Sequence, residues 1–281
     1  MCCIHVLKEM KRNVIPTGCK INLGLCITER RPDGYHNLQT IFYPVPLMDE
    51  LIISEADTDS LALGGHTLEG NPQDNLVLRA VRLMRQQGFS VPPLSISLRK
   101  NIPSGAGLGG GSSDAACVVR VLNERYGFGM SAEQMERLVA QLGADCPFFI
   151  KSQPVFAEGI GDIFTPIALH LSGWHLLLVK PDVHISTKEA YAGVHPHQAA
   201  YPLLETASLP VAQWRERMVN DFEESIFPGH PLLDEIKQEL YRQGAVYAAM
   251  SGSGSTLFGL FRQKPACQHL FAGHFTFCCQ L

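Results

Sequence analysis

The sequence has no marked excess of charge of either sign. Its 281 residues include 23 Lys and Arg and 27 Asp and Glu, which gives a formal net charge of −4. Proteins that bind a nucleic acid backbone normally carry clustered basic residues, whereas the basic runs here are no longer than a pair such as Arg30-Arg31. We therefore expect no nucleic-acid partner.

Long apolar segments are also missing. No stretch reaches the length needed to cross a bilayer, and the first residues, MCCIHVLKEMKRN, carry charges where a secretory signal has its apolar centre. With 46% hydrophobic and 18% charged residues, the composition is typical of a globular protein with one large domain or two ordinary ones. We expect a cytoplasmic protein with no membrane partner.

Paired cysteine ligands are absent as well. The nine cysteines form an odd set without a CxxC pair, and the eleven histidines include no HExxH motif. Zinc and dithiol redox sites usually show such spacing. We therefore expect reduced thiols, and histidines that serve as surface or core residues.

What the sequence does contain is an unusually bare loop. Residues 103–115, PSGAGLGGGSSDA, follow the strand-like alternation of LSISLRK and precede the helical pattern of AACVVRVLNERYG. Ser112, Ser113 and Asp114 are candidate N-caps, so the helix start would turn free N–H groups and a positive dipole toward the glycines. The pattern favours an anion site; the alternative is a flexible loop with an ordinary cap.

Other segments give a coarse outline of the fold. Residues 19–45 predict a strand, a turn at residues 31–34 and a second strand from near Leu38. Helices are predicted in NLVLRAVRLMRQQG, in SAEQMERLVAQLG with a capping box, and in PLLDEIKQELYRQG. HLLLVKP predicts a buried strand, and AVYAAM-SGSGS-TLFGLF a strand, a glycine-serine turn and a strand. A domain boundary is expected near residue 160.

Several known phosphate loops do not fit the glycine-rich segment. Gly111 stands where a Walker A loop needs lysine, and the window that should end a second Rossmann strand in an acid is helical, with Glu124 in its middle. The VAIK, HRD and DFG partners of protein kinases and a GxSxG elbow are all missing.

The segment that fits resembles the second motif of the GHMP kinases, the small-molecule kinases that include galactokinase, homoserine kinase and mevalonate kinase. KINLGL resembles the first motif of that family and SGSGSTLFGLF the third. The resemblance implies an α+β, two-domain GHMP kinase fold. Residues 1–160 would form the N-terminal nucleotide-binding domain, which is ribosomal protein S5 domain 2-like, and residues 161–281 the C-terminal α/β sandwich domain.

A finer resemblance concerns the acceptor. Lys20-Ile21-Asn22-Leu23, RPDGYH, GADCPFF and EGIG resemble the branch of this family that acts on 4-CDP-2-C-methyl-D-erythritol in the non-mevalonate isoprenoid pathway. It implies transfer of the ATP γ-phosphoryl group to the 2-hydroxyl. Two departures, Cys19 in place of alanine and KSQPVF without a glycine pair, touch no proposed reacting group.

The resemblance also implies residue roles. Asp145 would accept the hydroxyl proton, and Lys20 would hold both that carboxylate and the γ-phosphate. Asn22 lies two residues from Lys20, so on a strand it projects to the same side. Without the resemblance, Lys20 reads as a strand-edge lysine and Asp145 as a turn residue.

ATP would be held mainly by the backbone of the glycine loop, with two adenine contacts from Asn75 and Lys100. Magnesium is inferred from the need to screen the triphosphate, with no ligand set identified. Asp114 would repel phosphates unless it faces that ion or turns away. The expected nucleotide residues of the loop are Pro103, Gly105, Gly107, Leu108, Gly109, Gly110, Gly111, Ser112 and Ser113.

For the cytosine base, the resemblance implies a stack between Tyr35 and Tyr191, with His36 on the base edge and Thr187 nearby. Core packing remains the alternative for Tyr191. Two other functions stay open: a GHMP kinase for homoserine or mevalonate, and a member that binds nucleotide without catalysis. RPDGYH favours the cytidine-linked acceptor, and a monomer or weak homodimer is expected.

Overall fold

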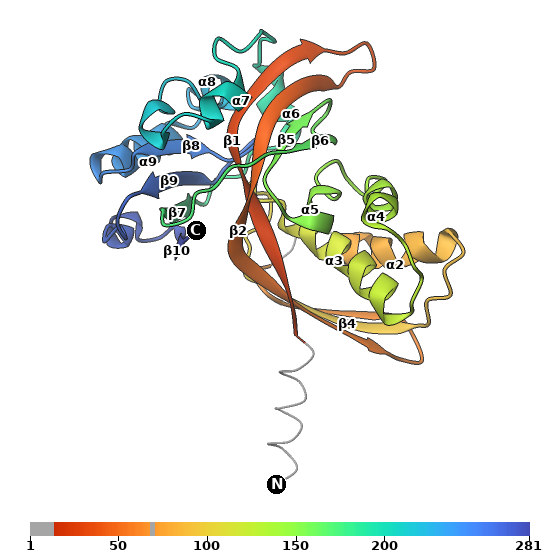
Figure 1. Ribbon diagram of the computed structural model, residues 1–281. Helices are drawn as coiled ribbons and strands as arrows, with labels where there is room; N and C mark the ends of the chain where they lie inside the picture. The colour runs from red at the N-terminus through yellow and green to blue at the C-terminus, as the bar shows by residue number, and fades with distance from the viewer. Residues whose placement is uncertain (1–13, 68–70) are drawn as a thin grey trace. The chain divides into compact units, whose positions relative to one another are not determined.

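A computed structural model describes residues 14–67 and 71–281 (Figure 1). Contacts group the described residues into two units: unit 1 contains residues 14–19, 47–67, 71–104 and 109–151, and unit 2 contains 20–46, 105–108 and 152–281. The chain therefore passes between the units several times. The predicted sequence boundary near residue 160 stays a prediction.

Two long strands form the N-terminal hairpin. β1 (Ile15–Arg30) pairs with β2 (His36–Glu55), and the turn between them is closed by the Arg31 amide donating to the Tyr35 carbonyl at 2.8 Å. The predicted strand, turn and strand are confirmed, although β2 begins two residues before Leu38. Both strands run from one unit into the other.

Unit 1 is a small sheet with helices on it. β4 (Leu94–Lys100) pairs antiparallel with residues 50–55 of β2 and parallel with β3 (Ser60–Gly65). Burial alternates along β4 as its sequence predicts. Figure 1 shows α2 and α3 side by side over this sheet. The helices are α2 (Leu76–Gln86), α3 (Gly110–Arg125), α4 (Ala132–Val139) and α5 (Phe148–Lys151), with a 3-10 turn at Pro72–Asp74.

The helix starts of unit 1 test the capping predictions. The capping box of α4 is present, since Ser131 and Gln134 bond each other's backbone amides. α3 differs from prediction because it begins at Gly110, with Gly109 as its N-cap in the left-handed region and no side-chain cap. The cap predicted at residues 112–114 was wrong, because these residues lie inside the helix, where Ser113 and Asp114 are buried.

Unit 2 contains two groups of strands. Residues 40–42 of β2 pair with β5 (Val155–Glu158), which pairs with β6 (Ile163–Pro166). The second group is an antiparallel sheet in the order β10-β7-β9-β8. Its strands are β7 (His175–Lys180), β8 (Tyr247–Met250), β9 (Leu257–Phe261) and β10 (Phe275–Gln280). β7 and the β8–β9 hairpin confirm the predicted strands.

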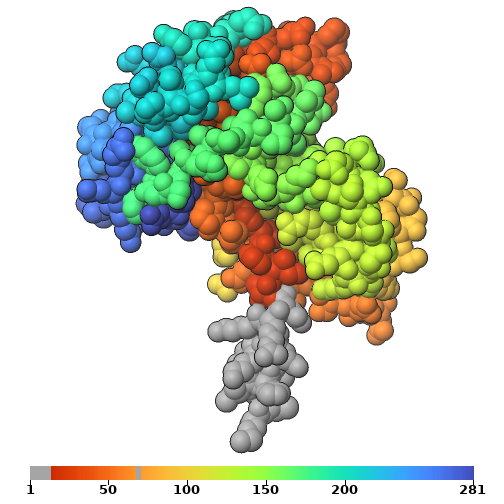
Figure 2. Space-filling model, in the orientation of Figure 1, coloured from red at the N-terminus to blue at the C-terminus, as the bar shows by residue number. Residues whose placement is uncertain are grey.

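Helices cover the second sheet of unit 2. α9 (Pro231–Arg242) packs on β8 and β9 around a core that includes Leu177, Leu233 and Met250. The shorter helices are α6 (Thr187–Ala192), α7 (Leu203–Ala207) and α8 (Asp221–Ile226), with 3-10 turns at Val211–Gln213 and Gln268–Phe271. Figure 2 shows the cyan segment that carries α7 and α8 at the surface. Among the described residues, no helix is both long and apolar enough to span a bilayer.

Candidate active site

The start of α3, in unit 1, leaves backbone amides without an acceptor among the described residues. In the described part of the chain, no group accepts a hydrogen bond from the amides of Gly110, Gly111 or Ser112, and the first regular bond runs from the Ser113 amide to the Gly109 carbonyl at 3.0 Å. Gly109 supplies the turn but no side chain. A 16-residue helix with free N-terminal amides attracts negative charge through its dipole and its N–H donors.

Two glycines of the loop are required for separate steric reasons. In unit 2, Gly107 has a φ of +72°, and a Cβ there would lie 2.0 Å from the Ser251 carbonyl oxygen. In unit 1, a Cβ on Gly110 would lie 2.9 Å from the Ile102 side chain and 3.3 Å from the Lys100 ammonium. Both glycines therefore permit close backbone approach that any larger residue prevents.

Beneath the start of α3 lies a buried charge cluster. The Lys100 ammonium forms ion pairs with Asp49 and with Asp114, the latter at 2.7 Å. The Thr17 hydroxyl donates to the other Asp114 oxygen at 2.5 Å. Asp114 therefore turns toward the protein interior, which resolves how a carboxylate can stand beside a phosphate loop.

The cluster has one ammonium for two carboxylates. Asp49 also accepts the backbone amides of Asn101 and Ile102, at 2.6 and 2.8 Å, so it is the better stabilised anion. Burial raises the pKa of Asp114 to about 6, against the opposing effect of Lys100. Lys100, expected at the adenine, has its ammonium occupied by these carboxylates, and its nucleotide contact stays a prediction.

The segment that carries Asp145 packs beside the same helix start. A Cβ on Gly143 would lie 3.5 Å from Cys146 Sγ and 3.9 Å from Ser112 Oγ. Burial raises the pKa of the Cys146 thiol to about 11, with the nearby Ser112 hydroxyl opposing the rise. Unit 1 thus brings Asp145 and the first turn of α3 into one neighbourhood.

Lys20 and Asn22 form a buried polar pair on β1 in unit 2. The Lys20 ammonium donates to Asn22 Oδ1 at 2.6 Å, and Asn22 Nδ2 donates to Thr40 Oγ1 at 3.0 Å. The same ammonium lies 4.9 Å from the Phe42 ring centroid. The Lys20 amide donates to the Leu108 carbonyl at 2.9 Å, which ties β1 to the unit 2 part of the glycine loop.

The glycine-serine segment, residues 251–255, packs onto this pair. Ser251 Oγ donates to the Gly107 carbonyl at 2.9 Å and accepts the Asn22 amide at 3.2 Å. A Cβ on Gly252 would lie 3.1 Å from Asn22 Oδ1 and 3.6 Å from the Lys20 ammonium. The first and third motifs are therefore neighbours in unit 2.

The predicted base-binding residues are only partly brought together. His36 stacks on Tyr191, with ring centroids 4.9 Å apart and planes inclined by 26°. Tyr191 also contacts Phe222 edge to face, with ring centroids 4.9 Å apart. It therefore has a contact on the core side as well as a stacking partner. Tyr35 is 61% exposed in the turn. Thr187 begins α6, one helical turn before Tyr191.

Other predicted contacts remain untested. Lys20 belongs to unit 2 and Asp145 to unit 1, so their pairing stays a prediction. Asn75 is the N-cap of α2, where its side chain accepts the Val77 amide at 2.9 Å, and its adenine contact stays a prediction too. So do the nucleotide contacts of Pro103 and Gly105.

Sequence reasoning did not single out Thr17 or Asp49. Asp49 could have been noticed, because it interrupts an alternating strand at an inward position between buried Leu47 and Leu51. Thr17 gives no such signal, since a threonine is ordinary in a strand.

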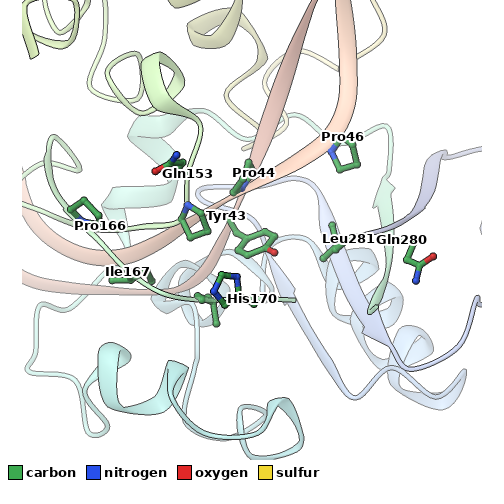
Figure 3. A pocket seen from close by; sticks show the side chains of 11 residues that line it. Tyr43, Pro44, Pro46, Gln153, Pro166, Ile167, His170, Gln280 and Leu281 are labelled. Atoms are coloured by element: carbon green, nitrogen blue, oxygen red, sulfur yellow. The ribbon is translucent and has the colours of Figure 1, made fainter. Parts of the chain in front are cut away.

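A separate cavity of about 440 Å³ lies within unit 2 (Figure 3). The rings of Tyr43 and His170 and several prolines face it. None of the predicted site residues lines it. Its lining consists of Tyr43, Pro44, Pro46, Gln153, Pro154, Pro166, Ile167, Leu169, His170, Gln280 and Leu281.

Comparison with known proteins identifies the family. The description "GHMP kinases N terminal domain" matches residues 75–153, and "GHMP kinases C terminal" matches residues 210–268. The chain is 54% identical over 265 residues to the 4-diphosphocytidyl-2-C-methyl-D-erythritol kinase of Bacteroides thetaiotaomicron, covering 93% of this chain and 96% of the relative. The chain belongs to this kinase family. The corresponding kinase of Chlorobium limicola is 40% identical over 257 residues, 89% of this chain and 88% of the relative.

Solved structures agree with this 4-diphosphocytidyl-2-C-methyl-D-erythritol kinase family. A crystal structure of 4-(cytidine 5'-diphospho)-2C-methyl-D-erythritol kinase superimposes with a TM-score of 0.82 at 30% identity, covering 94% of this chain and 97% of that one. Homoserine kinase from Cytophaga hutchinsonii gives 0.65 at 18% identity, covering 96% and 95%, which is a likeness of fold alone. The predicted α+β GHMP kinase fold is confirmed.

Proposed function

We propose that this protein is an ATP-dependent kinase that phosphorylates the 2-hydroxyl of 4-CDP-2-C-methyl-D-erythritol. The products are the 2-phosphate and ADP. The observation that carries the proposal is in unit 1, where the free amides at the start of α3 lie beside the segment that bears Asp145. Phosphoryl transfer needs this combination, because its loose transition state is stabilised mainly by alignment and charge neutralisation.

The nucleotide phosphates would bind the amides of residues 109–112 and the hydroxyls of Ser112 and Ser113. Asp49 and Asp114 form ion pairs with Lys100, so neither is proposed as a metal ligand. Mg²⁺ would be held by the phosphates together with a serine hydroxyl of the helix start, and it would supply neutralisation of the triphosphate charge. Lys100 supports the loop from beneath.

The acceptor hydroxyl would lose its proton to Asp145 as its oxygen bonds the γ-phosphorus and the bond to ADP breaks. Lys20 would bind the γ-phosphate. Asn22 accepts a hydrogen bond from the Lys20 ammonium and Thr40 in turn accepts one from Asn22, so the direction of the ammonium is fixed before substrate arrives.

Cytosine would stack on the aromatic residues of unit 2. His36 covers one face of Tyr191 in the described structure, so a base that stacks on that face must first displace the imidazole. Tyr35, which is exposed, would then close the stack, and His36 would bond the base edge. We propose that the displaced His36 makes this contact, with Thr187 nearby. The protein is proposed to work in the cytoplasm as a monomer or weak homodimer.

ATP consumption with three alcohols tests the substrate. Turnover is expected with 4-CDP-2-C-methyl-D-erythritol and not with homoserine or mevalonate. Those two belong to kinases with the same fold and little sequence identity, so they are the appropriate competitors. Comparable activity on homoserine would overturn the specificity.

Asp145→Asn tests the chemistry. Loss of the proton acceptor should lower kcat by about 100- to 10,000-fold while ATP affinity, measured by calorimetry, stays within about twofold. Asp57→Asn is the matched control, because Asp57 is an exposed carboxylate of unit 1 in the turn after β2. A near-native rate in Asp145→Asn would remove Asp145 from the mechanism.

A further inference from the structure

Three metal-ligating side chains meet in unit 2, outside the residues used above. Cys26 lies on β1, His197 in the segment after α6, and Asp221 begins α8. One ligand atom from each, a sulfur, an imidazole nitrogen and a carboxylate oxygen, lie within 4.8 Å of one another. Thiolate, imidazole and carboxylate together form a donor set suited to Zn²⁺ and similar borderline metals.

The separation of two of these atoms already fits a metal. His197 Nε2 lies 3.2 Å from Asp221 Oδ2. Two ligands bonded at about 2.0–2.1 Å to a tetrahedral centre are roughly 3.3 Å apart. The His197 side chain is about half exposed. It can therefore move the small distance that would bring its nitrogen and the Cys26 sulfur to the spacing of ligands on one metal ion.

The imidazole is oriented as metal-bound histidines are. His197 Nδ1 lies 2.9 Å from the carbonyl oxygen of Gln198. A proton on Nδ1 donates to that carbonyl and leaves the lone pair of Nε2 directed at Asp221. This second contact lies outside the three ligands and selects the tautomer that binds a metal.

The backbone next to Cys26 holds Asp221 and the His197 segment in place. The Ile27 amide donates to Asp221 Oδ2 at 2.7 Å, and the His197 amide donates to the Ile27 carbonyl at 2.9 Å. Cys26 is buried and the Asp221 side chain is only 8% exposed, while about half of the His197 side chain is exposed, so a cation can reach the site from solvent past His197.

Binding a metal would change the charge state of this site, because the Cys26 thiol must give up its proton to bind as a thiolate. Without a metal, His197 Nε2 contacts Asp221 Oδ2, and the Cys26 thiol donates a hydrogen bond to the His197 carbonyl at 3.5 Å.

We propose that Cys26, His197 and Asp221 form a three-ligand Zn²⁺ site, completed by water. The site would fasten the start of α8 and the segment after α6 to β1, and so stabilise unit 2. Short ligand spacing in the sequence gives no sign of this site, because Cys26 and His197 are 171 residues apart. This site is independent of the Mg²⁺ that accompanies ATP.

Titration of chelator-treated protein with Co²⁺ tests the proposal. One equivalent should bind and give the near-ultraviolet charge-transfer band of a Co²⁺ thiolate. The band should disappear in Cys26→Ser and persist in Cys279→Ser, a control that removes a partly buried thiol at the end of the chain. Absence of the band in the native chain, or its persistence in Cys26→Ser, would overturn the site.

His197→Gln is the second variant, because its half-exposed position makes the fold insensitive to the change. Co²⁺ affinity should fall at least tenfold, and the rise in Tm that Zn²⁺ gives the native chain should be lost. Unchanged affinity in this variant would leave only the ion pair. None of these measurements uses phosphoryl transfer, so the result is separate from the fate of the kinase assignment.

Discussion

The Lys100 ammonium lies 2.7 Å from the Asp114 carboxylate, with both groups buried beneath the first turn of α3. Asp49 binds the same ammonium from β2. The N-terminus of α3, which is proposed to hold the phosphates, has no side-chain cap. The helix is instead held in place by the buried ion pair between its own Asp114 and Lys100. The free amides are left for a ligand.

Lys100→Met should strongly destabilise the protein. It leaves two buried carboxylates without their cation, and breaking a buried ion pair in this way costs about 3–5 kcal/mol. Urea unfolding measures the loss. Lys151→Met is the matched control, since Lys151 makes exposed ion pairs in unit 1 that should contribute less than about 1 kcal/mol. Equal losses in the two variants would contradict the anchoring role.

Asp114→Asn should change how stability depends on pH. The pKa of Asp114 is about 6 in the folded protein and 3.8 for an unperturbed group, so between these values the folded state binds more protons. The stability contributed by this group is present below pH 4 and lost as pH rises through 6. Between pH 4 and pH 7 the native chain should therefore lose up to about 3 kcal/mol of unfolding free energy relative to Asp114→Asn.

Denaturant titrations of both chains at several pH values measure this shift. Using the difference between the two chains cancels the contributions of other carboxylates, such as Asp59, whose pKa is lowered beside Arg85, and Glu223, whose pKa burial raises. A pH-independent difference would show that Asp114 stays ionised throughout.

Gly107→Ala should abolish nucleotide binding or folding of the loop. The new Cβ would lie 2.0 Å from the Ser251 carbonyl oxygen. Gly127→Ala is matched in backbone strain, with a φ of +61°, but its Cβ meets nothing within 4 Å, so it should cost only about 1 kcal/mol. ATP binding by calorimetry and thermal unfolding separate the two. Similar losses in both variants would mean that glycine is needed at position 107 for its positive φ and not for the close approach of the Ser251 carbonyl.

Tyr191→Leu should weaken binding of the cytidine substrate about 5- to 150-fold, the equivalent of one lost stacking contact of 1–3 kcal/mol. ATP affinity should not change. Tyr201→Leu removes an exposed ring of unit 2 and should have no effect on either ligand. If the substrate KM of Tyr191→Leu stays native while its stability falls, the ring acts only in the core, through its contact with Phe222.

Local patterns predicted most of the secondary structure because their signals lie within a few residues. The alternation of β4 and the capping box at Ser131 were sufficient for their elements. The start of α3 was not predictable in this way, since capping rules look for a side chain and this helix uses Gly109 instead.

The site was recoverable only in part for a related reason. Family motifs identified Lys20, Asn22 and Asp145 as candidates, but the partners of Lys100 are 51 and 14 residues away. Among the proposed zinc ligands, Cys26 and His197 are 171 residues apart. Such groupings depend on how strands pair and helices pack, and short motifs do not encode that.

The hydroxyl of Ser251 has a single hydrogen, and the Gly107 carbonyl takes it. One of its two lone pairs accepts the Asn22 backbone amide. With its only hydrogen donated to Gly107, the side chain has no donor left for an anion. The Ser251 hydroxyl therefore links the glycine-serine segment to the glycine loop at Gly107 and to β1 at Asn22. An inhibitor aimed at the third motif should therefore seek contacts other than this hydroxyl.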